Sequence, residues 1–117
     1  MTRETFERIV EEEFEALPDR FRKNLDNVRI IVDDGDARPG RHGTILLGLY
    51  QGIPLTRRGG DYGAAPVLPD TITLFRTNIE MVARSEEEIR EEIRKTLVHE
   101  IGHYYGMSEA EIRDAGY

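Results

Sequence analysis

The 117-residue chain contains no cysteine and no tryptophan. The absence of thiols excludes a disulfide framework, and it also excludes a zinc site built on thiolates. Any metal site in this chain must therefore use nitrogen and oxygen ligands.

The chain also lacks a long apolar run and a run of lysines and arginines. Without about 20 consecutive apolar residues, no membrane-spanning helix is expected, and residues 1–18 carry no apolar segment typical of a secretory signal. The formal net charge is -7, which argues against nucleic-acid binding and against an electrostatic membrane anchor. These absences predict a soluble cytoplasmic protein without nucleic-acid or membrane partners, and nothing in the sequence specifies a number of subunits.

The hydrophobic pattern predicts an α+β fold, and the length suits one domain spanning residues 1–117. Apolar residues three and four apart predict a helix over Thr5–Leu17. Runs rich in β-branched and apolar residues predict three strands, at residues 28–34, 44–55 and 71–76. Residues 56–70 form a long irregular stretch, of a length that is often functional, and residues 78–84 are expected to form a short helix.

Ser85 opens the strongest predicted helix, because Ser85 and Glu88 fit a capping box and the acidic residues suit the positive end of the helix dipole. Apolar residues then recur at every fourth position from Ile89 to Ile101. Gly106 is expected to end this helix in a left-handed conformation. Ser108 is expected to cap a last short helix.

The C-terminal turns of this helix carry the pattern His-Glu-x-x-His, from His99 to His103. The two histidines lie one helical turn apart, so both imidazoles can reach one ion at about 2.0–2.1 Å. Glu100 lies beside them, where a carboxylate can take a proton from a zinc-activated water. The spacing therefore predicts a zinc site with His99 and His103 as ligands and Glu100 as general base. The alternative is a solvated helix whose histidines bind no metal.

The segment HEIGHYYGMSE, residues 99–109, resembles the extended zincin pattern. In that pattern a glycine turn after the second histidine leads to a third metal ligand, normally histidine or aspartate, and Glu109 occupies its position here. Residues 45–112 more widely resemble the small bacterial zincin-like metallopeptidase family, through the segments LLGLYQGIPLTRRG, PDTITLFRTNIE and EEEIREEIRKTLVHEIGHYYGMSEAEI.

This resemblance implies a minimal zincin-like fold of the α+β class, with a small mixed sheet, an N-terminal helix and the active-site helix beneath the sheet. It also implies zinc as the cofactor and a peptide or protein as the substrate. For the third ligand, Glu111, Asp114 or a water remains an alternative to Glu109.

The sequence as a whole predicts a zinc-dependent peptidase. The alternative from another class is a non-catalytic zinc-binding or interaction domain that retains the site. Glu100 favours the enzyme, because a purely structural site has no use for a base beside the metal. A regulatory peptidase that acts on one protein partner is a third hypothesis.

Several side chains outside the motif have both a functional and an ordinary explanation. His42 is either an additional ligand or a solvated turn residue. Glu92 either orients a histidine or is a solvated charge. Of Tyr104 and Tyr105, one is expected in the core, and the other is a candidate to stabilise an oxyanion or line a pocket.

Two segments and one glycine complete the candidates. The strand predicted at residues 44–55 either binds peptide as an added strand or is an ordinary core strand. Arg57 and Arg58 either recognise a carboxylate or maintain solubility. Gly102 costs the helix about 1 kcal/mol relative to alanine, so we expect it to pack closely against another element.

Overall fold

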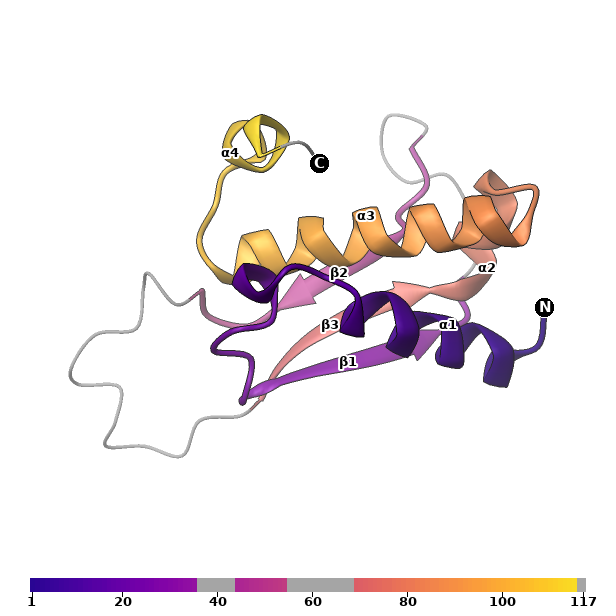
Figure 1. Ribbon diagram of the computed structural model, residues 1–117, viewed down its shortest axis with the longest axis horizontal. Coiled ribbons are helices and arrows are strands. Elements are labelled where there is room, and N and C mark those ends of the chain that lie inside the picture. The colour runs from indigo at the N-terminus through magenta and orange to yellow at the C-terminus, as the bar shows by residue number, and fades with distance from the viewer. Residues whose placement is uncertain (36–43, 55–68, 116–117) are drawn as a thin grey trace.

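The computed structural model describes residues 1–35, 44–54 and 69–115. These residues contain a three-stranded sheet with the order β1-β3-β2 (Figure 1). The strands are β1 (Val28–Asp33), β2 (Gly48–Gln51) and β3 (Asp70–Phe75). β1 pairs with β3 in parallel, and β2 pairs with β3 antiparallel. The sheet is therefore mixed, as predicted, and β2 lies at one edge of it.

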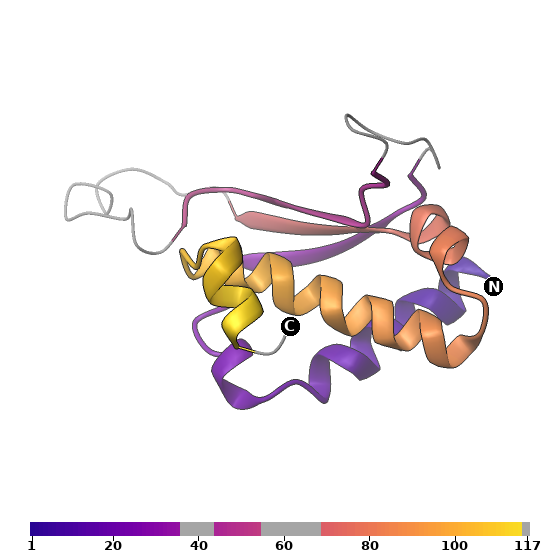
Figure 2. The same ribbon diagram turned by 90° about the horizontal axis from the view of Figure 1, so that it is seen from above.

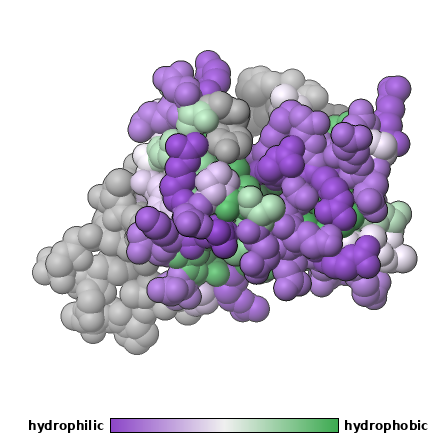
Figure 3. All heavy atoms as spheres, in the orientation of Figure 1, coloured by the Kyte–Doolittle hydropathy of each residue, from purple (hydrophilic) through white to green (hydrophobic). Residues whose placement is uncertain are grey.

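The helices lie on one face of this sheet (Figure 2). They are α1 (Arg3–Glu15), the 3₁₀ turn Asp19–Phe21, α2 (Arg76–Val82), α3 (Glu86–Tyr104) and α4 (Glu109–Asp114). α3 runs beneath the sheet and α1 packs against α3. The helical face turned to solvent is mainly hydrophilic (Figure 3). No helix in the described ranges is both long and apolar enough to cross a membrane.

The core lies between the sheet and the helices, chiefly α3 and α1. β3 buries alternate residues, including Ile72 and Leu74, because successive side chains of a strand point to opposite faces. α3 contributes Ile93, Leu97 and Ile101, which step by four and are fully buried. The α+β class expected from these two periodicities is confirmed, and the packing places one side of α3 directly under the sheet.

The bounds of several elements differ from those predicted. α1 begins at Arg3 because the Thr2 side chain accepts a hydrogen bond from the Thr5 N–H and caps the helix. The strand expected over residues 44–55 is restricted to β2, whose four residues pair with Thr71–Leu74. Gly52 follows at a φ of 152°, a backbone conformation that side chains rarely adopt.

The predicted cap of α3 is half confirmed. The Ser85 side chain accepts from the Glu88 N–H at 3.1 Å. The Glu88 carboxylate, however, accepts from the Arg84 N–H at 2.6 Å, one residue before the expected donor. Both contacts still give a hydrogen-bond acceptor to a backbone N–H group at the start of α3 that has no partner within the helix.

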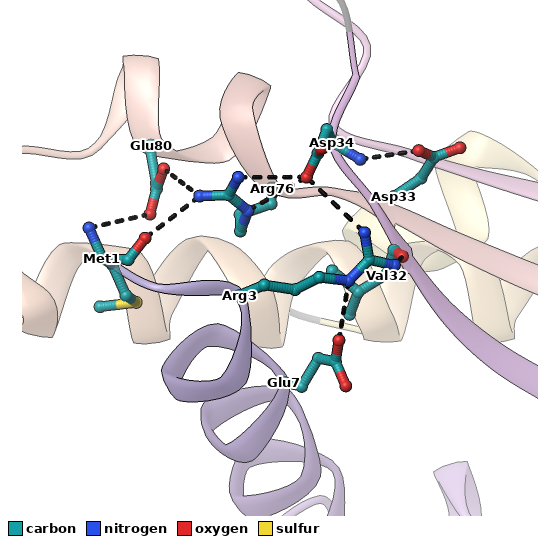
Figure 4. A network of polar contacts seen from close by, with 8 residues as sticks. All are labelled: Met1, Arg3, Glu7, Val32, Asp33, Asp34, Arg76 and Glu80. Atoms are coloured by element: carbon teal, nitrogen blue, oxygen red, sulfur yellow. Dashed lines mark hydrogen bonds and ion pairs between the residues drawn. The ribbon is translucent and has the colours of Figure 1, made fainter.

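A network of polar contacts joins the N-terminus to the ends of β1 and α2 (Figure 4). Arg76 contacts Asp34 at 3.1 Å and Glu80 at 3.4 Å, and the Met1 amino group lies 3.6 Å from Glu80. Arg3 donates to the Val32 carbonyl and also contacts Asp34. This N-terminal network lies at the end of the molecule opposite the α3–α4 junction (Figure 1).

Candidate metal centre

The His-Glu-x-x-His pattern occupies the last turns of α3, as predicted. The rings of His99 and His103 have centroids 4.8 Å apart, with an interplanar angle of 77°. The candidate ligand atoms of His99, Glu100 and His103 all lie within 4.8 Å of one another. Both imidazoles are only partly buried, so an ion from solution has access to them.

Glu109 reaches both histidines through a single oxygen atom. Its Oε1 lies 2.9 Å from Nε2 of His99 and 3.0 Å from Nε2 of His103. Burial opposes the ionisation of Glu109, but the hydrogen bond from His99 and the charges of both histidines outweigh it and lower the pKa of this carboxyl. The chain thus brings an ionised oxygen donor to the point that both imidazoles face.

The turn that delivers Glu109 is a Schellman motif. The Met107 N–H donates to the Gly102 carbonyl at 2.9 Å, and the Gly106 N–H donates to the His103 carbonyl at 3.0 Å. Gly106 has a φ of 85°, the left-handed conformation that was expected. Without this turn, a straight helix would carry residue 109 more than one turn beyond His103.

α4 is capped and docked immediately after the turn. Ser108 and Glu111 form a reciprocal capping box, in which each side chain accepts from the backbone N–H of the other. Ile112 is 1% exposed, and its side-chain atoms would lie 2.8 Å from a Cβ at residue 102. The expectation of close packing at Gly102 is confirmed: the absent side chain is what lets α4 sit against α3.

Glu100 has a different environment from Glu109. Its Oε1 accepts a hydrogen bond at 2.9 Å from the Tyr50 N–H of β2. Burial raises the pKa of Glu100 above its ordinary value, and the charges of His103 and His99 and the Tyr50 hydrogen bond oppose this only in part. In the described ranges, no arginine or lysine forms an ion pair with either glutamate.

The Tyr50 contact is a feature that sequence analysis missed. The Tyr50 hydroxyl donates to Oδ2 of Asp70 at 2.7 Å, and Asp70 is buried. The strand pattern of residues 44–55 indicated a tyrosine in a sheet but not the helix residue facing its backbone. The contact depends on how β2 lies over α3, which the three-dimensional structure shows.

β2 approaches α3 closely at Gly48. A Cβ at this position would lie 2.5 Å from Cγ2 of Thr96 and 3.4 Å from Cγ of Glu100. Glycine within a strand commonly marks either a bulge or such a close approach of the backbone, and at Gly48 it is the close approach. A cavity of about 280 Å³ opens beside the contact, between residues 45–48 and the side of α3 that carries His99 and Glu100.

The tyrosines adjoining the motif have structural partners. Tyr104 is 2% exposed and its hydroxyl donates to the Asn24 carbonyl at 2.8 Å, so Tyr104 is the core member of the pair. The Tyr105 hydroxyl donates to the Lys23 carbonyl. Both hydroxyls hold the segment that follows the 3₁₀ turn.

The remaining candidates separate into two groups. Within the part of the chain that the structure describes, no hydrogen bond joins Glu92 to His99 or His103, so the first of its two explanations, the orientation of a histidine, finds no support. Glu111 is engaged in the capping box, and Asp114 has no contact with either histidine there. The other candidates, His42, Arg57 and Arg58, lie outside the described residues.

The donor set fits zinc. Two imidazole nitrogens and one carboxylate oxygen are a ligand set found in catalytic zinc sites. Tetrahedral zinc with bonds of about 2.0–2.1 Å separates its ligand atoms by roughly 3.3–3.4 Å. The two nitrogen–oxygen distances of 2.9 and 3.0 Å are slightly shorter, so a small outward movement of Glu109 would make room for the ion.

A mixed sheet above a helix that carries two histidines, with a carboxylate brought to them by the following turn, defines a small zincin-like protein. A profile described as zincin-like metallopeptidase matches residues 25–117, and the chain belongs to this family. A family of this kind implies a metal, and the cluster around His99 and His103 supplies the candidate ligands.

One solved structure supports the same fold. It is a conserved hypothetical protein from Thermus thermophilus, which is 26% identical to this chain. The superposition has a TM-score of 0.61 and covers 90% of this chain and 94% of that chain. No curated protein matches the chain.

Proposed function

We propose that this protein is a zinc-dependent peptidase in which His99, His103 and Glu109 hold the metal and Glu100 is the general base. The observation that carries the proposal is the separation of the two carboxylates. Glu109 contacts both imidazoles, whereas Glu100 is held by the Tyr50 N–H. This arrangement suits Glu109 as a metal ligand and Glu100 as a base.

The chemistry divides between the metal and the chain. Bound zinc supplies a Lewis acid that lowers the pKa of water and polarises a carbonyl. Glu100 accepts the proton of the attacking water and passes it to the leaving amine. The Tyr50 N–H fixes one oxygen of Glu100, so that the other is directed to the proton it takes.

The outer edge of β2 is the proposed position of the peptide substrate. The Tyr50 N–H points to Glu100 and not to β3, so this edge faces the base. An extended peptide added along it would gain hydrogen bonds from outward backbone groups other than the Tyr50 N–H, which Glu100 engages, and it would lie above α3. Gly48, which brings β2 close to Thr96, keeps this edge near the metal ligands.

The alternative is a non-catalytic zinc-binding domain. A metal held by His99, His103 and Glu109 would also fix α4 to α3, which is a purely structural gain. Only cleavage distinguishes the two functions, because both predict the same metal content.

The test is cleavage of a broad peptide library by the native protein, by chelator-treated protein and by treated protein resupplied with zinc. The proposal predicts cleavage in the first and third samples and none in the second, with circular dichroism confirming that the treated protein stays folded. If the zinc-loaded protein cleaves no member of the library, the non-catalytic alternative takes its place.

A further inference from the structure

The cavity beside the metal centre is lined by two chemically different walls. Residues 45–47, which lead into β2, are isoleucine and leucines and form an aliphatic wall. The opposite wall is the side of α3 that carries Glu92, Lys95 and Thr96 before it reaches His99. The volume of the cavity, about 280 Å³, falls just below the range of about 300–1,000 Å³ typical of small-ligand pockets. The cavity therefore suits one side chain of a larger substrate.

The acidic side chains that line this cavity, Glu92 and Glu100, outnumber its one lysine, Lys95. Lys95 lines the cavity, but its ammonium group pairs with Oε1 of Glu91 at 3.2 Å. The Thr96 hydroxyl donates to the Glu92 carbonyl at 2.7 Å and is likewise engaged. The Glu92 carboxylate has no hydrogen bond or ion pair with any residue that the structure describes. An unpaired carboxylate beside an aliphatic wall favours a cation with a long apolar stem.

The position of Glu92 also sets the length of the side chain that can reach it. Glu92 precedes His99 by seven residues, which is about 10 Å along the helix axis. Helical side chains lean towards the N-terminus, so the carboxylate of Glu92 extends away from His99. A substrate backbone placed over His99 and Glu100 would therefore contact Glu92 only through a long side chain.

We propose that this cavity selects a lysine or arginine next to the scissile bond and that Glu92 is the specificity-determining residue. The inference rests on the proposed peptidase function, because it assumes that a substrate backbone lies at the metal centre. The methylenes of the basic side chain pack on residues 45–47, and its cationic end meets Glu92.

Binding of three matched hydroxamates to the zinc-loaded protein tests this without relying on turnover. The three compounds share one metal-binding group and one chain length, and they end in an ammonium, a methyl or a carboxylate group. Calorimetry should show the ammonium compound binding roughly tenfold more tightly than the methyl compound, and the carboxylate compound binding more weakly than both.

Substitutions test whether the Glu92 carboxylate causes the preference for the ammonium compound. Glu92→Gln should remove the ammonium preference and leave the affinity for the methyl compound unchanged. Glu87→Gln is the matched control, since Glu87 is an exposed glutamate in the first turn of α3, and it should keep the preference. Glu92→Lys should favour the carboxylate compound instead.

The outcomes separate this inference from the proposed function. Equal affinities for the three compounds, or a preference that survives Glu92→Gln, would overturn the role of Glu92 even if the protein is a peptidase. A protein that takes up no zinc would overturn the proposed function and this inference together. In the peptide library, cleavage next to lysine or arginine that is lost in Glu92→Gln is the corresponding supporting result.

Discussion

The molecule carries a charged cluster at each end, and the two differ in how their charges are balanced. In the N-terminal network, the Met1 amino group, Arg3 and Arg76 face Asp34 and Glu80. At the α3–α4 junction, Glu100 and Glu109 have only imidazoles and a backbone N–H as partners among the residues that the structure describes. The first cluster supplies its own cations, whereas the second contains no lysine or arginine paired with its carboxylates among those residues, which suits the zinc proposed to bind there.

The two clusters also differ in how their side chains are positioned. The side chain of Asp34 is 57% exposed and that of Arg3 is 48% exposed, so these groups can rearrange at little cost. Glu109, although exposed itself, follows a Schellman turn and begins a helix that is fixed by a capping box and by the contact of Ile112 with Gly102. Backbone constraints of this kind hold a donor in place, which a ligand site requires and a surface ion pair does not.

The largest effect is expected from Glu100→Gln, which removes the base and keeps the shape of the side chain. We expect the peptidase rate to fall by about 10²–10⁴-fold, because proton transfer by a positioned side chain contributes that much. Zinc content should stay at the native level, since Glu100 is not assigned as a ligand. Turnover of a library-derived substrate and elemental analysis of the same sample provide the measurement. Loss of the metal in this variant would show that the two glutamates have been assigned the wrong way round.

Glu109→Gln should have the next largest effect, and it acts on the metal. Removing the charged oxygen should lower the zinc affinity by more than the roughly 10–100-fold typical for loss of a residue that contacts a metal ligand. Glu111→Gln is the matched control, because glutamine can keep the capping box with Ser108. Competition with a chromogenic chelator measures both variants, and Asp114→Asn tests the remaining acid. A native affinity in Glu109→Gln beside a weakened one in either other variant would name a different ligand.

Gly102→Ala should lower the zinc affinity without a comparable fall in the free energy of unfolding. The new Cβ would lie 2.8 Å from side-chain atoms of Ile112, so this side chain must shift. Because Ile112 is buried, we expect α4 and Glu109 to move with it and the zinc affinity to fall roughly tenfold. Alanine is also more favourable than glycine in a helix interior by about 1 kcal/mol. This gain offsets the cost of the strain, so the free energy of unfolding should change little. Chelator competition and denaturant unfolding of the metal-free protein separate the two quantities. A variant with native zinc affinity would show that this contact does not position the ligand.

The smallest effect is expected at the other end, from Arg76→Gln. This change removes the contacts with Asp34 and Glu80, in which the Arg76 side chain is 21% exposed, and ion pairs near the surface contribute only about 0–1 kcal/mol each. The free energy of unfolding should fall by about 1 kcal/mol and the zinc affinity should not change. Denaturant titration and chelator competition check the two statements, and a coupled loss of zinc would remove the distinction between the clusters.

Local patterns predicted the elements that one stretch of chain specifies by itself. Ser85, Gly106 and Ser108 mark helix ends through contacts within a few residues, and all three have the expected backbone roles. The strand at residues 44–55 was predicted too long, because the length of β2 is set by its pairing with β3 and not by its own apolar residues.

The site was predictable to the extent that it lies on one helix. His99, Glu100 and His103 share a face of α3, and the zincin pattern placed Glu109 near them, although their roles in binding and catalysis stay predictions. The Tyr50 contact with Glu100 joins residues 50 positions apart, and no periodicity encodes it. The same is true of the cavity that contains Glu92, which exists only because β2 lies over α3.

The most direct test is the metal content of native protein purified without added metal. Elemental analysis should find about one zinc per chain, because His99, His103 and Glu109 offer two imidazole nitrogens and one carboxylate oxygen to one ion. His99→Ala and His103→Ala should reduce this to a trace, while His42→Ala, which changes the one histidine outside the motif, should retain it. Negligible zinc in the native protein, equal to that in the two alanine variants, would contradict the account.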